Sequence, residues 1–139
     1  MDIGKDIGLK LTPQRLAIFE YLNGNRSHPT AEDIYKEVSK RFPTMSLATV
    51  YNTLDALIKK GSIRELTIEP GKKRFDPDTS AHHHLICIGC RAITDVFEEF
   101  RPCIGECEKN GYEIIGTHIE FYGICPVCRD LQNTHLFGQ

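Results

Sequence analysis

Apolar residues recur every three to four positions in three short segments of the first half of the chain. In the first segment Thr12 is a candidate N-cap, Pro13 takes the first helical position and Gly24 follows the end. The apolar positions between them are Leu16, Ile18, Phe19 and Leu22. This spacing predicts a short helix with one apolar face.

Two further segments have the same organisation. Thr30 and Asp33 form a variant capping box ahead of a segment whose inner face is Ile34, Val38 and Phe42. The third segment has Ser46 as N-cap and Gly61 as C-cap. Its apolar stripe consists of Val50, Leu54, Leu57 and Ile58. The first half of the chain is therefore expected to contain three helices.

After the third helix the pattern changes to an imperfect alternation. Residues 62–76 alternate around a Pro70-Gly71 turn, which predicts a two-stranded hairpin. Three helices followed by a hairpin are typical of the winged helix-turn-helix, whose third helix lies in the DNA major groove. A small helical bundle with solvent-exposed lysines is the alternative interpretation.

The winged-helix interpretation assigns DNA contacts to the start of the third helix, to the hairpin and to one arginine of the first helix. The candidate DNA-binding residues are Arg15, Ser46, Ala48, Thr49, Tyr51, Asn52, Lys72 and Lys73. Lys72, Lys73 and Arg74 of the hairpin are expected to touch phosphates.

The net charge also differs between the two halves of the chain. Residues 1–72 carry 11 Lys and Arg against 9 Asp and Glu (+2), and residues 73–139 carry 6 against 10 (−4). The first part therefore suits a polyanion better than the second. The 139 residues are enough for one ordinary domain or two small ones, and no signal peptide or membrane span is evident. We expect a cytoplasmic protein.

Two C-x-x-C pairs, separated by 34 residues, stand in the second half. They are Cys87 with Cys90, and Cys125 with Cys128. In a reducing compartment such pairs indicate metal or redox chemistry rather than disulfides, and four thiolates suit Zn(II) in a closed tetrahedral site. Redox pairs and buried free thiols are the alternatives. We predict a structural zinc site whose loss unfolds the C-terminal domain.

Cys103 and Cys107 lie outside these pairs. With Phe100 and Ile104 they mark one face of residues 98–111, a segment of helical period that ends at Asn110-Gly111. We expect both to be buried as small apolar side chains, and a redox role is the alternative.

Three consecutive histidines lead into the first cysteine pair, where we expect a strand. His82 and His84 then share one face and His83 points away. If the chain turns back at residues 87–90, a simple register places Asp95 opposite His82, close enough to share an ion. A solvated histidine run is the alternative. His118 and Glu120, two residues apart, form either a polar strand edge or another partial site.

Five motifs give the chain a resemblance to the ferric uptake regulator (Fur) family along nearly its whole length. They are LTPQR, HPTAEDIY, SLATVYNTL, HHHLICIGC and YGICPVC, in family order and spacing. The resemblance implies an α+β protein with an N-terminal winged helix-turn-helix domain (1–77), a linker (78–81) and a zinc-containing C-terminal α/β dimerisation domain (82–139). It also implies a homodimer that binds a near-palindromic double-stranded DNA operator and is not an enzyme.

Within the family the chain is most similar to the peroxide-sensing (PerR) branch. The regulatory site of that branch uses three histidines and two aspartates, which fall on His28, Asp76, His82, His84 and Asp95. Nitrogen and oxygen donors suit Fe(II) or Mn(II). The resemblance implies that iron-catalysed oxidation strikes the positions of His28 and His82, and that the repressor then leaves DNA. Iron-sensing members commonly carry Glu at the position of Asp76.

The expected function is a metal-dependent transcriptional repressor that senses peroxide. An iron- or zinc-responsive metal-uptake repressor is the alternative within the family. The residues alone leave two other classes open, which are a small metal-dependent hydrolase or oxygenase and a zinc-stabilised adaptor without DNA binding. The first of these leaves the winged helix unexplained.

Overall fold

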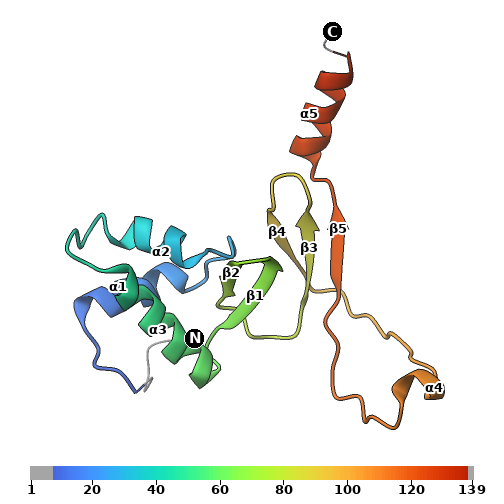
Figure 1. Cartoon of the computed structure of the whole chain (residues 1–139), viewed down its shortest axis with the longest axis horizontal. Helices are drawn as coiled ribbons and strands as arrows, with labels where there is room; N and C mark the ends of the chain where they lie inside the picture. The colour runs from blue at the N-terminus through green and yellow to red at the C-terminus, as the bar shows by residue number, and fades with distance from the viewer. Residues whose placement is uncertain (1–7, 138–139) are drawn as a thin grey trace. The chain divides into compact units, whose positions relative to one another are not determined.

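The computed structural model describes residues 8–137, which form two compact units that divide between Ser80 and Ala81. The first unit contains three helices and a hairpin, and the second contains a small sheet and two helices (Figure 1). None of the described helices is long and apolar enough to cross a lipid bilayer.

The three helices of the first unit are capped as the sequence predicts. They are α1 (Pro13–Leu22), α2 (Ala31–Val38) and α3 (Leu47–Lys60). Thr12 Oγ1 accepts the Arg15 N–H at 3.2 Å, and Thr30 and Asp33 form a reciprocal capping box. Gly61 ends α3 at φ 78°, a left-handed conformation that a residue without a β-carbon adopts at little cost.

A hairpin completes the first unit. The strands β1 (Arg64–Glu69) and β2 (Lys72–Asp76) pair antiparallel, with an irregular register between Thr67 and Glu69. An isolated bridge between Thr30 and Arg74 joins β2 to the residue that caps α2. This order and pairing of elements confirms the winged helix-turn-helix prediction.

The core of the first unit is formed by the apolar faces of its helices and by Phe75 of the hairpin. Its fully buried members include Ile18, Leu22, Ile34, Leu54 and Leu57. Burial of each such side chain contributes roughly 1.5–3 kcal/mol. Leu16 is 44% exposed, so the inner face of α1 is narrower than its sequence suggests.

The second unit is a three-stranded sheet with mixed pairing. Its strands are β3 (His83–Cys87), β4 (Ile93–Val96) and β5 (Glu120–Gly123), in the order β4-β3-β5. The strand β4 runs antiparallel to β3, whereas β5 runs parallel to it. A parallel neighbour requires a long connection, and residues 97–119 provide it. α5 (Pro126–Phe137) follows β5.

The connection between β4 and β5 extends beyond the sheet and has α4 (Glu106–Lys109) at its far end (Figure 1). The sequence predicts a longer helix. Pro102 lacks a backbone N–H and Gly105 weakens a helix, so α4 starts only after both. Its end at Asn110 is where the sequence places it.

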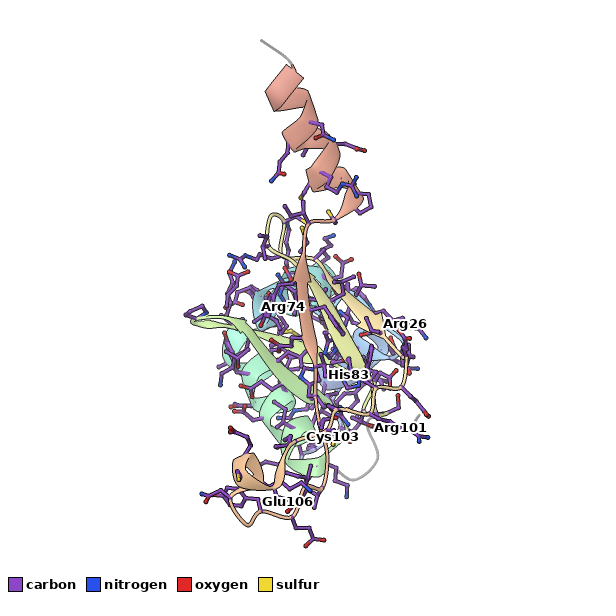
Figure 2. All side chains as sticks on the ribbon, turned by 90° about the vertical axis from the view of Figure 1, so that its right-hand side faces the viewer. Arg26, Arg74, His83, Arg101, Cys103 and Glu106 are labelled. Atoms are coloured by element: carbon purple, nitrogen blue, oxygen red, sulfur yellow. The ribbon has the colours of Figure 1, made fainter. Side chains whose placement is uncertain are left out.

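Cys103 and Cys107 are both exposed in the chain, so the expectation that they are buried apolar side chains is wrong. Cys103 lies on the segment that leads into α4, and Glu106 is the first residue of that helix (Figure 2). The physical reason is the interrupted helix, because no continuous helical face forms to carry the two thiols against the sheet.

Few of the described apolar side chains of the second unit are buried. Ile86, Cys87 and Ile93 are buried, whereas Tyr112 is 75% and Ile115 is 95% exposed. A unit of about 60 residues with so small a core needs reinforcement from a metal or from a second chain.

Candidate functional site

Four cysteines meet at one end of the sheet in the second unit. Cys87 ends β3, Cys90 lies in the following turn, and Cys125 and Cys128 flank the start of α5. Their four sulfur atoms lie within 4.8 Å of one another, and the Sγ atoms of Cys90 and Cys125 are 3.8 Å apart. Four thiolates about 2.3 Å from a tetrahedral Zn(II) are separated by about 3.8 Å. The cluster therefore fits structural zinc.

Backbone N–H groups prepare this cluster for a cation. The Cys125 N–H lies 3.3 Å from Cys87 Sγ and the Cys90 N–H lies 3.5 Å from it. These contacts lower the pKa of Cys87 to about 6, whereas interactions with the thiols of Cys125 and Cys87 raise the pKa of Cys128 to about 12. The cluster thus favours one thiolate, and a divalent cation supplies the charge that stabilises the others.

Gly89 allows the two cysteine pairs to approach each other. A β-carbon at this position would lie 3.0 Å from Cys128 Sγ and 3.3 Å from Cys128 Cβ. At these distances the Cys128 side chain would have to shift by a few tenths of an ångström, so a side chain at position 89 crowds the sulfur atoms.

His82, His84 and Asp95 come together on one face of the sheet. Asp95 Oδ1 lies 3.3 Å from Nε2 of His82 and 3.5 Å from Nε2 of His84, and all three side chains are buried. The two nitrogens and one carboxylate converge as ligands of one ion do.

The strand register that produces this grouping differs from the expected one. Asp95 is paired with His84, not with His82, because Ile86 pairs with Ile93 and the turn between the strands is two residues longer than assumed. A shift by an even number of residues keeps every side chain on its face. The predicted grouping survives a wrong register for this reason.

His83 has a structural role on the other face. Its Nδ1 accepts the Ile119 N–H at 2.9 Å, and its ring centroid lies 5.2 Å from that of Phe100 (Figure 2 labels His83). The contact ties β3 to the segment just before β5.

His118 is a functional candidate that the sequence left undecided. Its Nε2 lies 2.8 Å from Nδ1 of His84, the ring nitrogen that does not face Asp95. The parallel register pairs His84 with Glu120, so residues 118 and 120 share the face of His84. A sequence analysis that included this register would have identified His118. Glu120 interacts with the Tyr122 hydroxyl instead.

His28 and Asp76 form a second buried pair, in the first unit. His28 Nε2 lies 3.5 Å from Asp76 Oδ2, with side chains 1% and 2% exposed. Asp76 Oδ1 accepts the Asp78 N–H at 2.9 Å, which fixes the orientation of the carboxylate. His28 has φ 53°, in the left-handed region that few residues with a β-carbon adopt. Strain of this kind is concentrated at functional sites.

The predicted DNA-binding residues lie on α3, on the hairpin and near the start of α1. Six of them are exposed: Ser46, Ala48, Tyr51, Asn52, Lys72 and Lys73. Thr49 and Arg15 are half-buried. A groove of about 760 Å³ runs between α2, α3 and the hairpin and contains Tyr51 and Lys73.

Two carboxylates hold side chains of this surface in place. The Tyr51 hydroxyl donates to Glu32 Oε1 at 2.9 Å, which raises the pKa of Tyr51, and Lys73 Nζ lies 2.9 Å from Glu65 Oε1. The guanidinium of Arg74, the third basic residue expected to contact phosphates, donates to the His28 carbonyl oxygen at 3.3 Å.

Comparison with known proteins gives a consistent result. The model of the ferric uptake regulator family matches residues 6–122. The chain is 41% identical to the "Peroxide operon regulator" of Bacillus subtilis (strain 168), over 93% of this chain and 90% of that protein. It is 37% identical to the "Peroxide-responsive repressor PerR" of Staphylococcus epidermidis, over 91% and 85%. The solved ferric uptake regulator of Francisella tularensis with iron superposes with a TM-score of 0.72, 26% identity and coverage of 90% and 98%.

Proposed function

The chain belongs to the ferric uptake regulator family, and from that premise we propose that it is a metal-dependent DNA-binding repressor that senses peroxide. The observation that carries the proposal is the presence of two kinds of donor set. One is an all-sulfur cluster of four cysteines, and the other consists of buried histidine nitrogens and carboxylates. Relatives named as peroxide-responsive repressors support the choice of signal.

The proposed regulatory ligands are His28 and Asp76 together with His82, His84 and Asp95. Nitrogen and oxygen donors suit Fe(II) or Mn(II) rather than the metals that prefer thiolates. The Asp78 N–H holds the Asp76 carboxylate, and Asp95 lies between the Nε2 atoms of His82 and His84, so each group of ligands is ordered within its own unit. Iron, when bound, supplies the reduction of peroxide that leads to oxidation of a nearby imidazole.

The proposed ligands belong to both units, which explains how metal binding would control DNA binding. A metal that binds residues of both units favours one relative orientation of the DNA-binding unit. In a dimer the recognition helices must reach half-sites about 34–36 Å apart or a multiple of that distance. Metal binding and DNA binding are then coupled, and DNA tightens the metal in return. Oxidation of His28 or His82 removes a ligand and releases the operator.

Homodimerisation through the second unit is part of the proposal. Exposed apolar side chains on this unit include Leu85, Phe121, Tyr122, Ile115 and Tyr112. Exposed large apolar side chains favour a protein interface, and the small core of the unit gains from a second copy. A near-palindromic operator suits a two-fold symmetric dimer.

Peptide mass spectrometry tests the proposal. Zinc-loaded protein is charged with Fe(II) or with Mn(II) without oxygen, exposed to a small excess of hydrogen peroxide, digested and sequenced. We expect one added oxygen atom on His28 or His82 in the iron sample only. His83 is an internal control, because it is next to His82 but lies on the other face of the sheet. Unmodified histidines in protein that contains both iron and zinc would instead favour a metal-uptake repressor.

A further inference from the structure

The loop that carries His28 is attached to β2, the strand that ends in Asp76. The Phe75 N–H donates to the Pro29 carbonyl oxygen at 2.9 Å, and Thr30 and Arg74 form an antiparallel bridge. The Arg74 guanidinium donates to the His28 carbonyl oxygen at 3.3 Å. Three successive residues of the loop are therefore held by two successive residues of the strand.

The His28 backbone needs such support. Its φ of 53° is unfavourable for a residue with a β-carbon, and a conformation of this kind persists only where surrounding contacts impose it. Its carbonyl oxygen is the group that Arg74 contacts, and its side chain lies against Asp76. A side chain that fixes the His28 main chain therefore also fixes the direction of the imidazole.

Arg74 occupies an unusual place on β2. Lys72 and Lys73 precede it on the strand and are exposed, whereas Asp76 follows two residues later and is buried. Arg74 itself is half-buried, and Figure 2 labels it. Strand β2 thus carries two exposed lysines at one end and a proposed metal ligand at the other, with Arg74 between them.

We propose that Arg74 is a positioning residue for the regulatory metal, which holds His28 in its strained conformation and so presents the imidazole beside the Asp76 carboxylate. The inference rests on the proposed function, because it takes His28 and Asp76 as ligands. It assigns a role in metal binding to the arginine of the hairpin whose guanidinium donates to the main chain of a proposed ligand. The neighbouring Lys72 and Lys73 remain the candidates for phosphate contact.

Two rival roles make different predictions. If Arg74 contacts a DNA phosphate, its loss lowers DNA affinity at saturating metal and reduces the salt dependence of binding. If its positive charge only repels a nearby cation, its loss raises metal affinity. If Arg74 positions His28, its loss lowers metal affinity and leaves the salt dependence of DNA binding unchanged.

The experiment compares full-length, zinc-loaded wild type with Arg74→Ala, Arg74→Lys and Lys72→Ala. Mn(II) affinity is measured from free Mn(II) by electron paramagnetic resonance. Affinity for operator DNA is measured at saturating Mn(II) over a range of salt concentrations. We expect Arg74→Ala to lose roughly tenfold in Mn(II) affinity, in the range found for residues that orient metal ligands. Arg74→Lys, which keeps a cationic donor, should recover part of it.

The control variant should behave in the reverse manner. Lys72→Ala removes a positive charge two residues away on the same strand, so it should retain Mn(II) affinity and reduce the salt slope by about one. Arg74→Ala should keep the wild-type slope and the wild-type DNA affinity once Mn(II) is saturating.

Several outcomes overturn the proposal. They are unchanged or increased Mn(II) affinity in Arg74→Ala, a reduced salt slope in that variant, and no recovery in Arg74→Lys. If Arg74→Ala lowers the thermal unfolding temperature and also the metal-saturated DNA affinity, the role is structural and the proposal fails. Failure of wild type to bind Mn(II) at all refutes the proposed function instead, so the two results are distinguishable.

Discussion

The two candidate metal sites differ in where their ligands lie. The four cysteines belong to one unit and form two pairs that each span four residues, so folding of that unit places all four sulfur atoms. The proposed regulatory ligands form one buried pair in the first unit and a group of three in the second. A metal bound within one unit stabilises the fold of that unit. A metal that takes ligands from two units instead couples its binding to the relative orientation of those units.

The largest effect should come from the cysteine cluster. Replacing Cys90 by Ser, or removing zinc with a chelator, should unfold the second unit, because that unit buries few apolar side chains. The first unit has its own core and should remain folded. Limited proteolysis with mass spectrometry checks this, and survival of the intact second unit without zinc would contradict it. Thr94→Ser is a matched control on the same sheet.

Loss of a proposed regulatory ligand should impair DNA binding nearly as much as loss of the cysteine cluster, but it should have little effect on folding. Asp76→Ala should lower Mn(II) affinity by more than the roughly 10–100-fold found for residues that only support a ligand, and abolish metal-dependent DNA binding. Zinc content, measured by elemental analysis, should stay at one per chain. Loss of zinc in this variant would mean that the two sites do not divide the work as proposed.

Crowding the cysteine cluster should give an intermediate effect. A β-carbon at position 89 would lie 3.0 Å from Cys128 Sγ, so Gly89→Ala should destabilise the second unit by about 1–3 kcal/mol and speed zinc release. Gly105→Ala is the control, because no atom lies within 4 Å of its added β-carbon. Zinc transfer to a colorimetric chelator measures both, and equal rates for the two variants would refute the prediction.

The smallest effect should come from His118. Its ring lies 2.8 Å from Nδ1 of His84, but His118 is exposed, so water can take its place. His118→Ala should lower Mn(II) affinity by less than about tenfold, and His118→Gln, which keeps an acceptor, should lose less. Titration of Mn(II) into zinc-loaded protein decides this. A change in the rate of zinc release would show that His118 acts on the cysteine cluster and not on the proposed regulatory site.

Local signals in the sequence predicted the first unit well. Thr12, Thr30 and Ser46 cap their helices because each side-chain oxygen accepts an N–H three residues later, within the same short segment. The cysteine spacing was equally informative, because the two cysteines of each C-x-x-C pair are only three positions apart in the sequence. The grouping of His82 and His84 followed from the two-residue period of a strand.

Features that depend on distant contacts could not be predicted in this way. The register of Asp95 depends on the length of a turn, and the position of His118 depends on a parallel pairing across 36 residues. The hydrogen bond from Arg74 to the His28 carbonyl oxygen could not be predicted either, because its two residues lie 46 positions apart. The exposure of Cys103 follows from Pro102 and Gly105, which interrupt the expected helix.

The parallel pairing of β5 with β3 also has a consequence during protein synthesis. Cys87 and Cys125 are 38 positions apart, so at roughly 5–20 residues per second the ribosome takes about 2–8 s to supply the second pair of cysteines after the first. The core of the DNA-binding unit is made of earlier residues and can form in that interval. A nascent chain is therefore able to shape its DNA-reading surface before it is able to retain zinc.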